Sequence, residues 1–248
     1  MEIYTYLSLG LYFITMLGIG VYSYVNTKNN VSGFMLGGRR LGPGVTALSA
    51  GASDMSGWML MGLPGALYVS GLSSIWIAIG LTVGAYLNYL LVAPRLRIYT
   101  EIANDAVTMP EFFERRFEDK SHLLRVISST VIIVFFAIYT TSGVVAGGKL
   151  FETSFGLSYE LGLYITAGVV VSYSVFGGFL AVSTTDFVQG CIMFVALILV
   201  PIVAFTEFDS VSQMTSAAYQ SVPNFSESLE TLTIVGLLSS LGWGLGYF

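Results

Sequence analysis

The sequence predicts an all-α polytopic membrane protein, and two observations carry that prediction. Hydrophobic residues make up 54% of the 248 residues and charged residues only 10%, against about 25% charged in an average soluble domain. The hydrophobic residues gather in runs long enough for helices to cross a bilayer, which takes about 20 residues each. We therefore expect a multi-pass protein whose surroundings are the lipid bilayer.

Hydropathy indicates six spans and the start of a seventh. The six lie near residues 5–25, 45–70, 74–94, 124–147, 159–181 and 186–206, and the seventh begins near residue 231. The first has no basic flank before it and exceeds the apolar part of a signal peptide, so we expect it to be retained. Because the sequence ends inside the seventh span, we expect an incomplete N-terminal portion that does not transport alone.

Basic residues predict how the spans are oriented. Nine of the ten Lys and Arg residues fall on one side if every segment crosses, in the connections after the first and third spans. The positive-inside rule makes that side cytoplasmic and the N-terminus extracytoplasmic in the cell membrane. The acidic stretch 207–230 then forms an extracytoplasmic loop.

Composition excludes several classes of function. A net charge of -5 with scattered basic residues offers no surface for nucleic acid. The single cysteine, Cys191, excludes an internal disulfide and a cysteine-based metal site, and the single histidine, His122, excludes HExxH zinc chemistry. Asp54 and Asp186 lack the sequence context of intramembrane aspartyl proteases. We expect no enzyme, no catalytic residue and no organic cofactor.

The second span carries polar residues that an inert anchor lacks. Thr46, Ser49, Ser53 and Ser56 recur at helical spacing and share one face. Asp54 lies in the same span, and a carboxylate in mid-membrane costs at least about 2.5 kcal/mol, so it marks a functional site by default. The alternative is a structural Asp paired with an Arg or a hydroxyl on a neighbouring helix.

Glycines and a proline interrupt the second span on both sides of its carboxylate. Gly51 and Gly57 flank the carboxylate, and Gly62, Pro64 and Gly65 follow. A broken helix exposes carbonyls and amides that bind a cation or a carboxylate, as in secondary transporters. Close helix packing through small residues is the competing account.

Four further residues are candidates with an equally good structural explanation. Asp186 begins the sixth span, where a helix N-terminal charge is as good an account as function. Tyr139 lies in the fourth span, where a tyrosine usually packs and bonds its hydroxyl. Trp243 and Tyr247 share a helical face, and anchoring at the membrane interface is their alternative.

A short helix is predicted in the connection between the third and fourth spans. Thr108, Pro110 and Glu111 combine an N-cap, a first-turn proline and a capping-box acid. We expect its aromatic residues to pack against the membrane or the helix bundle.

The sequence resembles the sodium/solute symporter family along essentially the whole chain, and five segments carry the resemblance. They are Leu-Gly-Gly-Arg at 36–39, Gly-Ala-Ser-Asp-Met-Ser-Gly-Trp at 51–58, Arg-Phe-Glu-Asp-Lys-Ser at 116–121, Gly-Gly-Phe-Leu-Ala-Val-Ser at 177–183 and Gly-Trp-Gly-Leu-Gly-Tyr at 242–247. The run at 53–58 is the most specific of them.

The resemblance implies the N-terminal half of a LeuT-type inverted-repeat transporter. Residues 1–30 then form an extra N-terminal helix and residues 31–206 the first five-helix repeat. Residues 207–230 form the extracytoplasmic loop, and residues 231–248 begin the second repeat.

The resemblance further implies sodium-coupled symport of L-proline into the cell by alternating access, with sodium the only metal ion. It assigns sodium binding to the carbonyls of Ala52 and Met55 with Asp54, and a place on the sodium route to Asp186. The residues implied for proline binding are Ser56, Gly57, Tyr139, Trp243 and Tyr247, and Ser49 and Arg39 are implied as supporting residues. The alternatives are a sodium- or proton-coupled symporter of another small carboxylate and a membrane sensor module on the same fold.

Overall fold

The computed structural model describes residues 2–26, 31–222, 225 and 233–247, and every regular element among them is a helix. The described residues fall into two compact units. The first unit comprises Met1–Ser56 and Ala106–Phe194, and the second comprises Gly57–Asp105 and Val195–Phe248.

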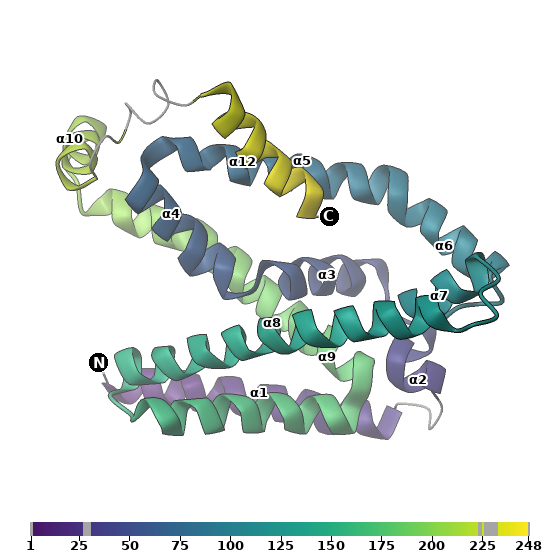
Figure 1. The fold of residues 1–248 in the computed structure, drawn as a ribbon. Helices are drawn as coiled ribbons and strands as arrows, with labels where there is room; N and C mark the ends of the chain where they lie inside the picture. The colour runs from purple at the N-terminus through teal and green to yellow at the C-terminus, as the bar shows by residue number, and fades with distance from the viewer. Residues whose placement is uncertain (1, 27–30, 223–224, 226–232, 248) are drawn as a thin grey trace. The chain divides into compact units, whose positions relative to one another are not determined.

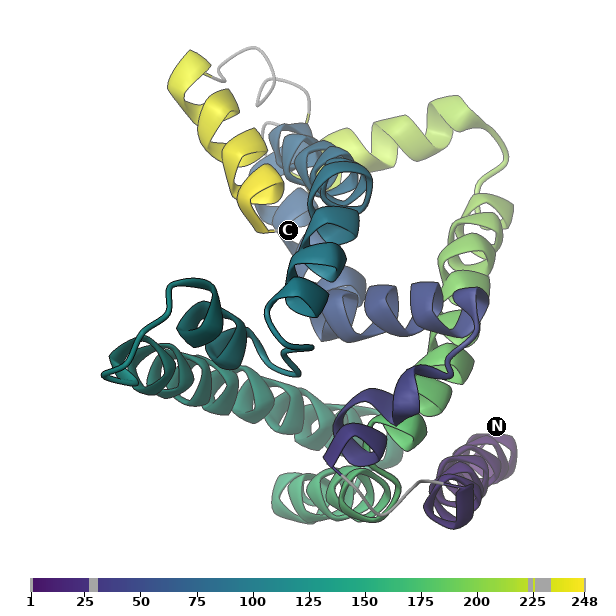
Figure 2. The same cartoon turned by 90° about the vertical axis from the view of Figure 1, so that its right-hand side faces the viewer.

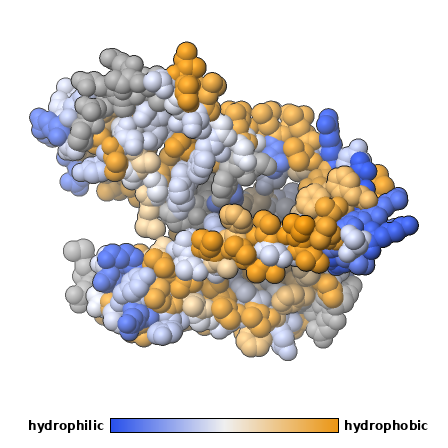
Figure 3. Space-filling view, viewed as in Figure 1, coloured by the Kyte–Doolittle hydropathy of each residue, from blue (hydrophilic) through white to orange (hydrophobic). Residues whose placement is uncertain are grey.

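The first unit is built from long helices with short elements between them (Figure 1). Its elements are α1 (Glu2–Asn26), α2 (Val31–Leu36), a 3₁₀ turn (Gly37–Arg39), α3 (Pro43–Gly57), α7 (Met109–Arg116), α8 (Leu123–Phe155) and the larger part of α9 (Tyr159–Thr206). Apolar surface follows α8 in Figure 3, and side chains such as Ile133 and Phe135 are exposed along it. Such a surface is suited to lipid or to another helix.

The second unit contains shorter helices in close succession. Its elements are a π-helical stretch (Trp58–Gly62), α4 (Leu63–Ser70), a 3₁₀ turn (Gly71–Ser74), α5 (Ile75–Leu87), a second π-helical stretch (Asn88–Val92), α6 (Ala93–Ile102), α10 (Val211–Ser221) and α12 (Ile234–Tyr247). Helix α10 lies in the segment predicted as the loop 207–230.

In the part of the chain that the structure describes, four helical stretches are long and apolar enough to cross a membrane. They are Tyr6–Asn26, Leu63–Ile102, Leu123–Phe155 and Tyr159–Thr206, and Ile234–Gly246 is a shorter apolar helix. These stretches agree with the predicted class of all-α polytopic membrane protein. The last one, at 48 residues, is much longer than the about 20 residues that one crossing needs.

A kink at Gly178 divides helix α9 (Figure 1). Gly178 has φ 58° and ψ -154°, a conformation that residues with a Cβ atom rarely adopt. A Cβ atom there would also lie 2.8 Å from the Phe34 carbonyl oxygen. The kink lies within the predicted span 159–181, close to its C-terminal end.

The predicted interruption of the second span is found on one side of Asp54 only, since α3 runs unbroken through Gly51. Helix α3 ends at Gly57, and the π-helical stretch follows at once from Trp58. The change from i→i+4 to i→i+5 hydrogen bonding alters which carbonyls have a regular helical partner, and such stretches are frequent at functional sites.

The predicted short helix is α7, and its capping pattern is confirmed. The Thr108 hydroxyl accepts a hydrogen bond from the Glu111 amide at 3.3 Å. The Glu111 carboxylate accepts one from the Val107 amide at 2.8 Å, one residue before the position of a standard capping box. Figure 2 shows α7 beside the start of α8, where Glu114 Oε1 lies 2.8 Å from His122 Nδ1.

Candidate functional site

A buried carboxylate on α9 meets two hydroxyls of α3 in the first unit. The Ser49 hydroxyl donates to Asp186 Oδ2 at 3.0 Å, and the Ser53 hydroxyl donates to the same oxygen at 2.7 Å. Ser49 and Asp186 are only 6% and 8% exposed. The four-residue spacing of the serines places both on the α9 side of α3, as the polar stripe in the sequence predicts.

Helix α8 reaches the same turn of α3 through Tyr139. The Tyr139 hydroxyl donates to the Ser53 backbone carbonyl at 2.9 Å. Ser53 is therefore bonded through its hydroxyl to α9 and through its carbonyl to α8. We call Ser49, Ser53, Tyr139 and Asp186 the serine–aspartate cluster.

The serine–aspartate cluster is suited to attracting a cation. Both hydrogen-bond donors to Asp186 are neutral hydroxyls, so the contact leaves the charge of an ionised carboxylate in place. Among the described residues, no Lys or Arg forms an ion pair with Asp186. A carboxylate in apolar surroundings is costly unless a proton or a cation compensates its charge.

The structure brings three predicted site residues of the first unit together. Ser49, Tyr139 and Asp186 meet in the serine–aspartate cluster. Ala52 and Asp54 are partly exposed on the same helix, α3. Arg39 is exposed at the end of the 3₁₀ turn with φ 57°.

Three predicted residues at the end of α3 are described only by their backbone. They are Met55, Ser56 and Gly57, which are helical. The roles assigned to them and to the other site residues stay predictions.

The predicted aromatic residue Trp243 lies in the second unit. Its ring packs against that of Trp58, with ring centroids 5.2 Å apart and planes inclined by 43°. Trp58 belongs to the most specific motif of the sequence, yet sequence reasoning gave it no role. Tyr247 is the last residue of α12, and its side chain lies outside the described part.

Glycines bring α12 against α5 next to this aromatic pair. A Cβ atom on Gly80 would lie 2.6 Å from the Leu241 carbonyl oxygen, and one on Gly244 would lie 2.5 Å from the Leu81 amide nitrogen. The backbones therefore touch directly, as small residues at four-residue spacing allow in membrane helices. The Gly80 and Gly84 spacing signals this contact, which sequence reasoning missed.

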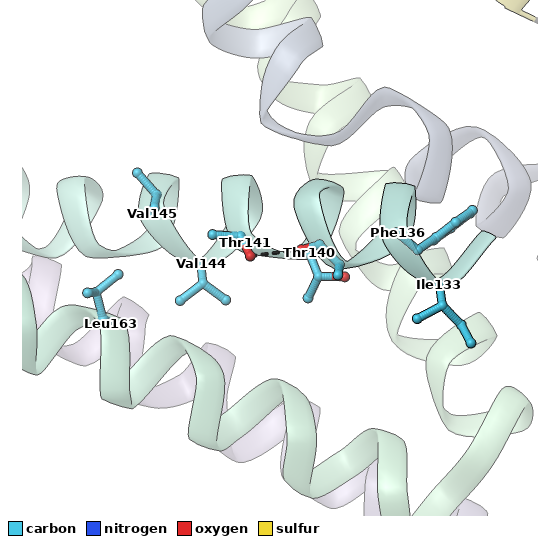
Figure 4. A pocket seen from close by; sticks show the side chains of 8 residues that line it. Ile133, Phe136, Thr140, Thr141, Val144, Val145 and Leu163 are labelled. Atoms are coloured by element: carbon cyan, nitrogen blue, oxygen red, sulfur yellow. Dashed lines mark hydrogen bonds between the residues drawn. The ribbon is translucent and has the colours of Figure 1, made fainter. Parts of the chain in front are cut away.

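An open apolar groove of about 580 Å³ follows α8 (Figure 4). Ile133, Phe136 and Val144 of α8 line it, together with Leu163 of α9. The Thr141 hydroxyl on its wall donates to the Ala137 carbonyl of its own helix at 2.8 Å. The groove therefore offers mainly apolar contact.

These features define a multi-pass helical membrane protein in which an interrupted helix carries polar groups between apolar spans. The chain belongs to the sodium:solute symporter family, whose model matches residues 34–248. This confirms the resemblance found in the sequence.

Two curated relatives match nearly the whole chain. The osmoregulated proline transporter OpuE of Bacillus subtilis (strain 168) is 56% identical over 248 residues, which are 100% of this chain and 50% of that protein. The sodium/proline symporter of Staphylococcus aureus (strain JH9) is 52% identical over 244 residues, 98% of this chain and 48% of that protein. The chain thus spans about half the length of these relatives. No solved structure matches it.

Proposed function

We propose that the chain is part of a sodium-coupled symporter that carries L-proline into the cell by alternating access. The main support for this proposal is the 56% identity to a proline transporter over all 248 residues. The serine–aspartate cluster supports it, because it provides a carboxylate for a cation beside the interrupted helix α3. A sodium ion moving down a membrane potential contributes about 2.3 kcal/mol per 100 mV, which drives uphill uptake if proline binds together with sodium.

Each predicted residue receives a role in this proposal. Sodium is held by the Ala52 and Met55 carbonyls with Asp54, and it moves along a route that includes Asp186. Carbonyl oxygens are suited to a hard cation such as sodium. The residues proposed to contact proline are Ser56, Gly57, Tyr139, Trp243 and Tyr247, and those proposed to support the site are Ser49 and Arg39.

We further propose a LeuT-type arrangement with six spans and the start of a seventh, inserted in the cell membrane with the N-terminus outside. The kink at Gly178 supports two crossings within α9. Single cysteines introduced in a Cys191→Ser background test this arrangement. We expect a cysteine at Ser121 to react with an impermeant maleimide only from the cytoplasmic side, and one at Ser216 only from outside. Labelling of both from the same side would contradict the topology.

Uptake by a chimera tests the proposed function. The chain is joined to the part of the Bacillus subtilis relative that it does not match, and the chimera is reconstituted in proteoliposomes beside the chain alone. We expect labelled proline to accumulate under an inward sodium gradient, and not under matched potassium or a proton gradient. Uptake driven by protons, or competition only by another small carboxylate, would favour the alternative symporters. No uptake by folded chimera under any gradient would favour a sensor role.

Asp54→Asn in the same chimera tests the residue assignment. We expect a higher half-saturating sodium concentration or a complete loss of uptake, because the variant removes the charge at the sodium site. Sodium dependence equal to that of the parent chimera would remove Asp54 from the mechanism.

A further inference from the structure

Helix α1 makes a polar contact with α9 one helical turn from the buried carboxylate. The Gln189 side-chain amide donates to the Tyr12 hydroxyl oxygen at 2.8 Å and lies 3.7 Å from the Met16 sulfur. Helix α1 ends at Asn26, so it lies wholly outside residues 34–248 that match the family model. The family match therefore assigns nothing to this contact.

Close packing accompanies the polar contact along one face of α1. Tyr12, Met16, Gly20 and Ser23 recur at helical spacing. Met16 and Ser23 are 1% and 0% exposed. A Cβ atom on Gly20 would lie 2.9 Å from the Cβ atom of Tyr173 on α9. This face is therefore fitted to α9, whereas a lipid anchor needs only apolar residues on all sides.

The same short stretch of α9 also touches α3, through residues next to Gln189 on the helix surface. Asp186 bonds the two serines of α3, and a Cβ atom on Gly190 would lie 3.4 Å from the Leu48 carbonyl oxygen of α3. Gln189 lies between these two residues in the chain. Residues 186–190 are thus held by α1 through Gln189 and by α3 through Asp186 and Gly190.

We propose that α1 is a positioning element for the cation site, and that Tyr12 and Gln189 are the positioning residues that hold Asp186 against Ser49 and Ser53. A rotation or slide of α9 that carries Asp186 about 1 Å away from α3 would lengthen hydrogen bonds of 2.7 and 3.0 Å beyond bonding range. The Tyr12–Gln189 bond opposes both movements. The inference rests on the proposed sodium function for its effect on transport, but not for its effect on α9.

Two variants remove the bond with little change in shape, and a third serves as control. Tyr12→Phe deletes the hydroxyl, and Gln189→Leu replaces the amide by an apolar group. Thr15→Val removes a hydroxyl of the same helix. That hydroxyl donates to the Leu11 carbonyl within α1 at 2.8 Å. Thr15 is exposed, so its loss leaves the contact with α9 intact.

Hydrogen exchange of residues 183–191 is the first measurement, made on the chain itself in lipid nanodiscs. We expect faster exchange of this stretch in Tyr12→Phe and Gln189→Leu than in the parent and Thr15→Val, with the double variant no faster than the faster single variant. Equal exchange in the parent and all variants would overturn the inference whatever the transport results. If the parent chimera shows no sodium-driven uptake, the proposed function fails and this measurement alone decides whether α1 positions α9.

Uptake kinetics in the chimera are the second measurement. We expect the half-saturating sodium concentration to rise about five- to tenfold in Tyr12→Phe and Gln189→Leu, the range that one lost hydrogen bond permits. The KM for proline at saturating sodium is expected to match the parent, because proline contacts are untouched. A parallel rise in both constants would indicate general loosening of the fold and would also overturn the positioning role. If the variant chimeras transport proline with the same sodium dependence as the parent, the positioning role is also overturned.

Discussion

The serine–aspartate cluster and the α5–α12 contact join helices by opposite means. The first uses side-chain hydrogen bonds, 2.7 and 3.0 Å long, to one carboxylate oxygen. The second has no side chains between the backbones, since Gly80 and Gly244 let them meet directly. The first contact is therefore sensitive to the loss of a single polar atom, and the second to the gain of a single carbon. This difference fits the proposed role of the cluster in cation binding.

The largest expected effect is the opening of the α5–α12 contact by Gly244→Val. The new Cβ atom would lie 2.5 Å from the Leu81 amide nitrogen, a backbone atom that cannot turn aside. We expect a loss of about 3 kcal/mol in the free energy of unfolding, the upper end for overpacked interiors. Thermal unfolding in detergent measures it.

Gly242→Val is the matched control for this variant. It makes the same change in the same helix, but a Cβ atom there meets nothing within 4 Å. Equal melting temperatures of the two variants would show that α12 does not pack on α5 through Gly244.

The next effect is the loss of the carboxylate in Asp186→Ala. The buried Ser49 hydroxyl and the more exposed Ser53 hydroxyl lose their acceptor. We expect a loss of about 2 kcal/mol in stability, within the range for unsatisfied buried polar groups. Glu152→Ala is the control, since Glu152 pairs with Lys149 at 2.7 Å on the exposed surface. Its loss is expected to cost less than about 1 kcal/mol. A similar loss in both variants would mean that Asp186 is not buried in the membrane protein.

The sequence predicted one of these two contacts better than the other, for a physical reason. Helical spacing alone places Ser49 and Ser53 on one face, so the polar side of α3 follows from local geometry. Asp186 as their acceptor does not follow, because a partner 133 residues away is set by tertiary packing. Pairing with hydroxyls was weighed for Asp54, and the structure shows it for Asp186.

The α5–α12 contact was not predicted, although its signal is present. The spacing of Gly80 and Gly84 marks a face that a second helix approaches closely. It does not identify that helix, because many glycines of this chain have the same local pattern. Trp58 was missed for a similar reason, since its packing on Trp243 depends on how α12 returns to this unit.

Helix α7 is capped by polar contacts that lie outside the apolar spans and nearer to water. Thr108→Ala removes the hydroxyl that accepts from the Glu111 amide at the start of α7. We expect a loss of about 1 kcal/mol, typical of an N-cap, and faster hydrogen exchange confined to α7. Thr130→Ala is the control, since its hydroxyl donates to the Val126 carbonyl within α8 at 2.8 Å. Faster exchange of α7 in the control as well would contradict a capping effect.

The smallest expected effect concerns Asp119, an exposed carboxylate with more hydrogen-bond donors than Asp186. The Ser121 hydroxyl and the Leu124 and Ser121 amides all donate to it, and these bonds hold its pKa below the usual 3.8. A pKa lowered by folding stabilises the protein above the unfolded value, and the contribution is lost as the pH falls through the folded value. We therefore expect the small difference in stability between the parent and Asp119→Ala to be constant near neutral pH and to shrink below pH 3.8. Thermal unfolding across that pH range measures the stability difference. If the difference grows on acidification, the predicted direction of the pH dependence is wrong. Three donors at an exposed carboxylate then stabilise the fold less than two at a buried one, because water replaces the lost bonds at Asp119 and has little access to Asp186.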